Sequence, residues 1–174
     1  TWKDEKLLKD MMGTLVHRGP DDSGFLIDNN VSLGHLRLSI IDLSERGRQP
    51  IYNEDKSICI LYNGEVYNYI ELREDLKNLG HQFYSDTDTE VIIHAYEQWG
   101  FDCIDKLNGM FAFVIYDKNK DILFFGRDRF GIKPLYYYLK DKKIIFASEI
   151  KAILAHNMPR IPNESLIFDF IMYN

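Results

Sequence analysis

Cysteine, proline and long apolar runs are all scarce in this sequence. Its 174 residues include two cysteines and five prolines, and two cysteines are too few for a disulfide framework. No apolar run approaches the roughly 20 residues that a transmembrane helix needs, and the charged first ten residues do not resemble a signal peptide. We therefore expect a cytoplasmic protein with no membrane partner.

Positive charge is also in short supply. The 21 basic and 27 acidic side chains give a net charge of −6, which makes nucleic acids and anionic membranes poor candidate partners. Glycine-rich phosphate-binding loops and the G-x-S-x-G turn of serine hydrolases are absent. The histidines have no metal-ligand spacing with cysteine or with one another, so the sequence predicts no metal site. They are His17, His35, His81, His94 and His156.

What is present indicates one globular domain. The hydrophobic fraction of 45% and the charged fraction of 28% are ordinary for a folded protein, and a chain of this length can bury about two thirds of its unfolded surface. We expect this domain over residues 1–158. Pro159 and Pro162 interrupt the pattern that follows, so we interpret residues 159–174 as a linker and the start of a further domain.

The pattern along the chain combines strands and helices. Because strand pairs outnumber strand–helix–strand units, we expect an α+β domain with largely antiparallel sheets. The predicted strands are residues 25–28, 31–43, 57–62, 81–84, 110–117, 122–127, 135–139 and 144–147. The predicted helices are residues 2–16, capped by Thr1, a second from Asn68 to Gly80, a third from Thr87 to Trp99, and residues 101–107, 149–156 and 163–173.

Arg37 lies in an apolar run, so we expect its side chain to be partly buried. A buried guanidinium needs an anionic partner. An internal salt bridge and a fork for a ligand carboxylate both satisfy that need, and from this residue alone the salt bridge is favoured.

Three further clusters have alternative interpretations. Asn63-Gly64 is typical of a hairpin turn, but an Asn side chain beside a Gly backbone N–H also makes an oxyanion hole. The acidic cluster over residues 85–90 fits a helix cap or a site that receives an ammonium group. Residues 126–135, with two glycines, a proline and four charges, indicate a structural salt-bridge network.

Taken together, the clusters resemble one family, the glutamine-hydrolysing domain of asparagine synthetase. This is a class II glutamine amidotransferase with the N-terminal-nucleophile (Ntn) hydrolase fold. The resemblance covers nearly the whole chain and rests on eight motifs in order. They are H-R-G-P-D-D-S-G (17–24), G-H-L-R-L-S-I-I-D (34–42), Q-P-I-Y-N (49–53), Y-N-G-E-V-Y-N (62–68), S-D-T-D-T-E-V (85–91), L-N-G-M-F-A-F (107–113), G-R-D-R-F-G-I-K-P-L-Y-Y (126–137) and F-A-S-E-I-K-A-I (146–153).

The resemblance implies a four-layer αββα sandwich, with two antiparallel sheets between helical layers. It also implies that a cysteine thiolate attacks the side-chain amide of L-glutamine. Arg37 would grip the α-carboxylate, helped by the backbone of residues 38–41. Asn63 and Gly64 would form the oxyanion hole, and Glu65 and Asp88 would contact the substrate, with Asp88 holding the α-ammonium group. No cofactor is implied here, since ATP and Mg²⁺ belong to a synthetase domain of the same protein, and a homodimer is left open.

The nucleophile is where this sequence departs from the family. In the family the cysteine opens the chain on a first strand, whereas Thr1 stands directly at the opening helix. We therefore expect that strand to be missing and the chain to be inactive by this route. Cys59 and Cys103 lie in apolar surroundings and are interpreted as inert core residues.

Three alternative functions are left open by the sequence. One is an amidotransferase domain for another carboxylate acceptor, such as a sugar acid. The second is a non-catalytic module that binds glutamine. The third is an unrelated hydrolase that uses Cys59 or Cys103 as its nucleophile.

Overall fold

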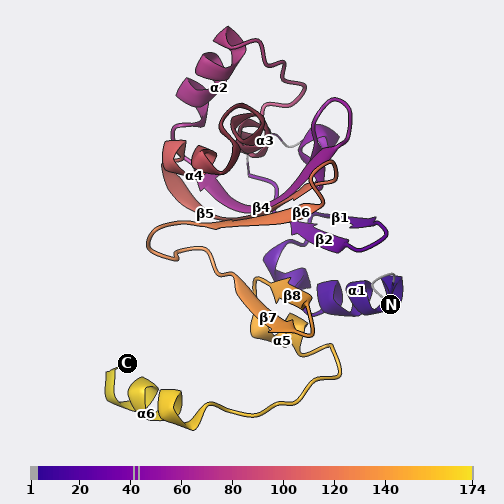
Figure 1. The fold of residues 1–174 in the computed structure, drawn as a ribbon, viewed down its shortest axis with the longest axis vertical. Coiled ribbons are helices and arrows are strands. Elements are labelled where there is room, and N and C mark those ends of the chain that lie inside the picture. Colours follow the sequence, from indigo (N-terminus) through magenta and orange to yellow (C-terminus); the bar gives the residue numbers. More distant parts are fainter. Residues whose placement is uncertain (1–3, 41, 43, 174) are drawn as a thin grey trace.

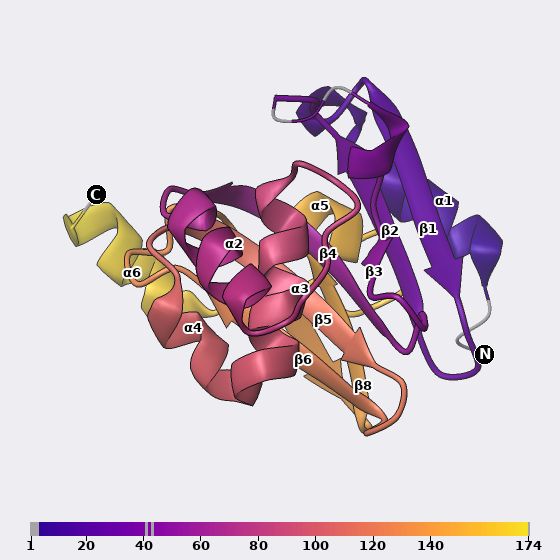
Figure 2. The same cartoon turned by 90° about the horizontal axis from the view of Figure 1, so that it is seen from above.

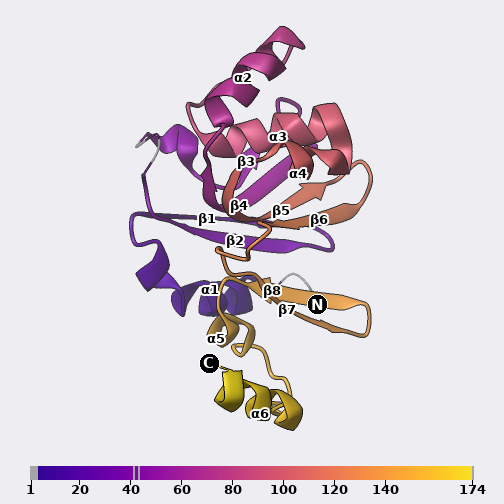
Figure 3. The ribbon, with the colours of Figure 1, turned by 90° about the vertical axis from the view of Figure 1, so that its left-hand side faces the viewer.

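A computed structural model describes residues 4–40, 42 and 44–173 of the chain. The elements are stacked in layers around a central antiparallel sheet (Figure 3). One helical layer covers one face of this sheet, and two hairpins followed by further helices cover the other. This arrangement agrees with the expected α+β class and αββα layering.

The central sheet has the strand order β3-β4-β5-β6, and its three pairings are antiparallel. Its long middle strands pair over nine residues, whereas β3 pairs with only two residues of β4. The outer edge of β4 is therefore left open beyond that short pairing. The strands are β3 (Ile51–Tyr52), β4 (Ile58–Val66), β5 (Gly109–Asp117) and β6 (Ile122–Arg127).

Two separate hairpins face the other side of this sheet, so the second strand layer is divided and not one continuous sheet. The β8 side chain Phe146 packs edge-on against Phe125 of β6, with ring centroids 4.9 Å apart. Figure 1 shows both hairpins below the central sheet. They consist of β1 (Asp22–Ile27) with β2 (Ser32–Arg37), and of β7 (Tyr136–Lys140) with β8 (Lys143–Ala147).

The helices lie on the two outer sides of the strands. In Figure 2, α2 and α3 cross above the central sheet, and α1 and α5 pack against the hairpins. The α-helices are α1 (Glu5–Gly13), α2 (Tyr69–Asn78), α3 (Asp88–Trp99), α4 (Cys103–Lys106), α5 (Ile150–Ile153) and α6 (Glu164–Tyr173). The short 3-10 helices are η1 (Val16–Arg18), η2 (Glu45–Gly47) and η3 (Gly100–Asp102).

Strand β4 is buried on both faces, and its side chains alternate between two cores. Ile58, Ile60 and Tyr62 belong to the core beneath the helices, whereas Cys59 and Leu61 belong to the core beneath the hairpins. This alternation follows from the period of two in a strand. The same rule directs the next odd-numbered side chains of β4, Asn63 and Glu65, toward the hairpin side.

Local end signals located α3 well but left other boundaries wrong. The Thr87 hydroxyl accepts from the backbone N–H of Glu90 at 3.3 Å, as predicted for this cap. Asn68 stands before α2, but its side chain bonds the backbone of Lys106 and Asn108 instead of capping. Helix α1 is capped by Asp4, and Thr1 lies outside the described residues.

Two strand predictions are wrong. The predicted strand 31–43 ends as β2 at Arg37, and residues 38–40, 42 and 44 form no regular structure. The predicted strand 81–84 is irregular, because it packs against α3 without a strand to pair with. A segment forms a strand when a neighbouring strand pairs with its backbone N–H and C=O groups. The apolar pattern of a segment does not show whether such a neighbour exists.

The loop 126–135 is structural, but it is built from backbone hydrogen bonds and not from the predicted salt bridges. Asp128 is buried and accepts from the backbone N–H groups of Phe111, Ile132 and Lys133 at 2.9–3.2 Å. Although burial opposes ionisation, these bonds hold the pKa of the Asp128 carboxyl below its usual range. Arg127 donates to the carbonyl of Lys133 at 2.7 Å.

Helix α6 stands apart from the layers and is exposed along its whole length (Figure 1). Its exposed apolar side chains are Leu166, Ile167, Phe168, Phe170, Ile171, Met172 and Tyr173. Among the described residues, no helix combines the length and the apolar character that crossing a bilayer requires.

Candidate active site

A cavity of about 770 Å³ lies between the central sheet, the two hairpins and α1. It is large enough for an amino-acid-sized ligand. All five residues proposed from the sequence line it, although they come from three different elements. They are Arg37 at the end of β2, Asn63, Gly64 and Glu65 on β4, and Asp88 at the start of α3.

The Arg37 side chain is buried and points its guanidinium at a loop. It donates to the backbone carbonyl of Ser44 at 2.9 Å and to that of Asp42. The expected salt bridge is replaced by these carbonyl contacts, which fix the guanidinium plane without neutralising its charge. Because a Cβ at Gly47 would collide with Arg37 Nη2, that glycine makes room for the side chain. A buried cation of this kind suits a ligand carboxylate.

Asn63-Gly64 lies inside β4, so the hairpin interpretation is wrong. The strand continues to Val66 because β5 pairs with it throughout, Asn63 opposite Ala112 and Gly64 opposite Phe111. A Cβ at Gly64 would meet the Met110 carbonyl, so a side chain is excluded here.

The Asn63 side chain carries a buried donor with no partner. Its Nδ2 is one of two buried polar side-chain atoms without a hydrogen bond in the part of the chain that is described. An unpaired buried N–H group costs free energy on the order of 1–3 kcal/mol. A ligand oxygen that accepts from Asn63 Nδ2 would recover that cost.

The open edge of β4 is occupied by side chains instead of a strand. Gln49 Oε1 accepts from the Tyr62 N–H at 2.6 Å, and Gln49 Nε2 donates to the Tyr62 carbonyl at 3.1 Å. The Val66 N–H donates to Asp88 Oδ2 at 3.0 Å. Since alternate N–H groups of a strand point to the same side, the N–H of Gly64, midway between them, faces this edge too.

Asp88 is held in place by the same edge. Its Oδ2 also accepts from the Tyr62 hydroxyl at 2.8 Å. Burial raises the pKa of the Asp88 carboxyl, against the effect of its hydrogen bonds. Burial and the Asp88 charge raise the pKa of Tyr62 as well. An ammonium group beside Asp88 would offset the cost of burying this carboxylate.

His35 and Gln49 were not singled out from the sequence, although both lie in the quoted motifs. His35 Nε2 donates to the Tyr62 carbonyl at 3.0 Å, and its buried Nδ1 has no partner among the described residues. Their contacts with Tyr62 join positions 13 and 27 residues apart, and no local pattern reports such pairs. The signal available in the sequence was that both are polar residues within the motifs that carry the resemblance.

His35 predicts a pH dependence of stability. Burial lowers the pKa of this imidazole from 6.5 to about 4, so folding disfavours its protonation. The neutral imidazole contributes stability that is fully present above pH 6.5 and is lost as the pH falls through about 4. Over this range its contribution to the free energy of unfolding falls by no more than about 3 kcal/mol. Urea denaturation at pH 7.5 and pH 5 measures this loss. We expect a smaller loss in His35→Gln, whose amide can still donate to Tyr62, and equal losses in both proteins would contradict the assignment.

Neither cysteine belongs to the cavity. Cys59 and Cys103 are fully buried, and burial raises the pKa of their thiols to about 11 and about 12. A thiol attacks as its thiolate, so both are poor nucleophiles at neutral pH. This agrees with their interpretation as inert core residues.

The chain is similar to known proteins over nearly all its length. The glutamine amidotransferase domain family matches residues 1–173. Asparagine synthetase [glutamine-hydrolyzing] 1 of Bacillus subtilis is 48% identical over 163 residues, which cover 93% of this chain and 26% of that protein. An amidase of Penicillium rubens is 43% identical over 151 residues, which cover 87% and 22%.

The fold has counterparts among solved structures. The glutamine phosphoribosylpyrophosphate amidotransferase of B. subtilis, solved with ADP and GMP, superimposes with a TM-score of 0.74 at 20% identity. The match covers 86% of this chain and 40% of that one. This likeness confirms the α+β, Ntn-hydrolase type of fold.

Proposed function

Because the chain belongs to the glutamine amidotransferase domain family, we propose that it hydrolyses L-glutamine to glutamate and ammonia in an asparagine synthetase. The ammonia would then serve the ATP-dependent amidation of aspartate. The similarity to a glutamine-hydrolysing asparagine synthetase supports this acceptor. The chain spans about a quarter of the length of that relative, so the activity of the whole protein is part of the proposal.

The observation that carries the proposal is the unpaired Asn63 Nδ2 in the cavity that Arg37 also lines. When a thiolate adds to the amide carbonyl, the C=O electron pair moves onto oxygen. Asn63 Nδ2–H and the Gly64 N–H would donate to this oxyanion. The C–N bond then breaks as the amide nitrogen takes up the proton that the thiol lost, and ammonia leaves. Water adds to the thioester, which releases glutamate and restores the thiol. Cys59 and Cys103 are too deeply buried to be the attacking thiol, so the thiol of this scheme would be the N-terminal cysteine that the family resemblance implies, which is not among residues 1–174.

The charged residues would select the amino-acid end of the substrate. Arg37 would hold the α-carboxylate, and Asp88 the α-ammonium group. The hydrogen bonds that Asp88 Oδ2 accepts from Tyr62 and Val66 hold this carboxylate in position for the ligand. Glu65, next to the oxyanion hole on β4, would contact the substrate from the same face.

The partners of the domain follow from this scheme. We propose that residues 159–174 lead toward the synthetase domain, which would bind ATP and Mg²⁺, and glutamine hydrolysis here would need no cofactor. The apolar side chains of α6 support a contact with another protein surface, since exposed apolar patches mark interaction sites. A cytoplasmic location and a homodimer stay predictions.

Glutamine-dependent ammonia release by the full-length protein tests the function. We expect the Cys59→Ala and Cys103→Ala double variant to retain this activity, because neither thiol reaches the cavity. Loss of activity in a folded double variant would favour the hydrolase alternative. If wild-type protein releases no ammonia, calorimetry with glutamine decides whether the domain only binds it.

A different ammonia acceptor is the second candidate function. The 43% identity to a protein named an amidase supports this candidate. Product analysis with aspartate and with other carboxylates separates the two, because glutamine hydrolysis is common to both.

A further inference from the structure

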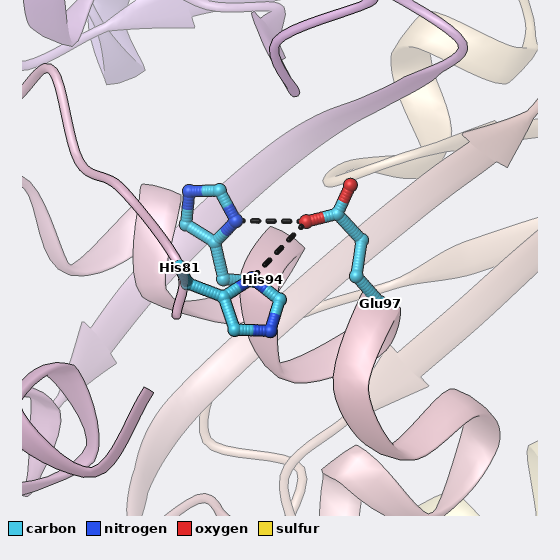
Figure 4. Close-up of side chains that lie close together, drawn as sticks. All are labelled: His81, His94 and Glu97. Atoms are coloured by element: carbon cyan, nitrogen blue, oxygen red, sulfur yellow. Dashed lines mark hydrogen bonds and ion pairs between the residues drawn. The ribbon is translucent and has the colours of Figure 1, made fainter. Parts of the chain in front are cut away.

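Three potential metal ligands meet on the helical side of the central sheet, away from the cavity. They are His81, His94 and Glu97, and their ligand atoms all lie within 4.8 Å of one another. His94 and Glu97 stand one turn apart on α3, and His81 lies in the segment that leads from α2 back to α3. Figure 4 shows both imidazoles directed at the same carboxylate.

The distances suit a single small ion. Glu97 Oε2 lies 2.8 Å from His94 Nδ1 and 3.6 Å from His81 Nδ1. Ligands of a tetrahedral zinc ion, bound at 2.0–2.1 Å, are separated by about 3.3 Å. The two separations from Glu97 Oε2 are within about 0.5 Å of that value, and the ligand atoms of the two imidazoles lie within 4.8 Å of each other.

The other nitrogen of each imidazole already has a partner. His81 Nε2 lies 3.1 Å from Gln98 Oε1, which accepts its hydrogen and leaves the Nδ1 lone pair for a metal. His94 Nε2 faces the buried carboxylate of Glu90 at 3.6 Å. Metal-ligating histidines are typically oriented in this way, by a carboxylate or carbonyl oxygen on the far nitrogen.

The two oxygens of the Glu97 carboxylate also have different surroundings. Its Oε1 accepts from Asn53 Nδ2 at 2.8 Å, so Oε2 is the oxygen turned to the histidines. The His94 side chain is 2% exposed, whereas those of His81 and Glu97 are 16% and 20% exposed. The cluster is thus held from within and open to solvent on one side, which provides an entry path for an ion.

We propose that His81, His94 and Glu97 bind one divalent transition-metal ion, with zinc as the probe. Two imidazoles and a carboxylate favour ions of the zinc, nickel and copper class over Mg²⁺ or Ca²⁺. On binding, His94 Nδ1 releases its hydrogen to solvent and gives its lone pair to the metal, and water occupies the fourth position. The ion links the segment after α2 to α3, so its effect is on the helical layer and not on the cavity.

Calorimetric titration of the full-length protein with ZnSO₄ tests this site, after removal of any histidine tag and of bound metal. We expect one Zn²⁺ per chain at this site, and we expect that excess Mg²⁺ or Ca²⁺ does not displace it. His81→Ala should weaken zinc binding by about tenfold or more. The matched control is His156→Ala, which removes a histidine from the opposite side of the molecule and should bind as the wild type does.

Co²⁺ absorption provides a second readout that does not depend on the heat of binding. The visible bands of tetrahedral cobalt should appear with wild-type protein and be lost in His81→Ala and in Glu97→Gln. Glu97→Gln is nearly isosteric and can still accept from Asn53, so it guards against misfolding of the other variant. Absence of stoichiometric zinc binding, or affinity unchanged in both variants, overturns the proposal and leaves a hydrogen-bonded ion-pair cluster.

Discussion

Asn63→Ala is expected to lower kcat for glutamine hydrolysis by about 10²–10³, with little change in KM. The donor on Asn63 Nδ2 has no protein partner, so its hydrogen bond is available to the substrate. That bond strengthens as charge develops on the amide oxygen, and interactions that strengthen in the transition state raise kcat. Steady-state assay of ammonia or glutamate release measures the effect.

Asn63→Asp sharpens this test. Aspartate has nearly the same shape, but when ionised it presents only acceptors where the oxyanion needs a donor. We expect it to be as slow as the alanine variant. Asn78→Ala, an exposed change at the end of α2, is the matched control and should leave kcat unchanged. Full activity in either Asn63 variant would contradict the oxyanion-hole role.

Parts of the fold with strong local signals were predictable. The cap at Thr87 and the proline pair at 159 and 162 each act over a few residues. The continuation of β4 through Asn63-Gly64 was not predictable in this way. Its conformation is decided by pairing with β5 nearly 50 residues later, and that long-range pairing overrides a local turn preference.

The same distinction between local signals and long-range contacts applies to the candidate site. Its five residues were found by resemblance, and the structure brings them around one cavity. Tyr62, Gln49 and His35 were missed because their contacts depend on the short β3, which leaves the β4 edge open. The sequence predicted no metal site because the histidines lack metal-ligand spacing with one another. The proposed cluster brings His81 to α3 through an irregular segment, and sequence spacing does not report that contact.

Arg37→Lys is expected to lower kcat/KM for glutamine by about 10² or more, mainly through KM. Lysine keeps the positive charge but loses the planar fork that binds a carboxylate with two parallel hydrogen bonds. Losing a buried charge-assisted contact costs about 2–5 kcal/mol, and each 1.4 kcal/mol is about tenfold. Initial rates over a range of glutamine concentrations measure the change. Arg46→Lys, an exposed change in the same loop, is the control.

Arg37 also supports its loop by donating to the carbonyls of Asp42 and Ser44. A substrate analogue separates this role from the binding of the substrate carboxylate. The analogue 4-aminobutanamide is glutamine without its α-carboxylate. Wild-type protein should discriminate strongly against it, whereas Arg37→Lys should discriminate far less, since the group that reads the carboxylate is altered. If Arg37 only supported the loop, the variant would lose activity toward both compounds equally. If the variant discriminates between the two compounds as strongly as the wild type does, a residue other than Arg37 binds the carboxylate.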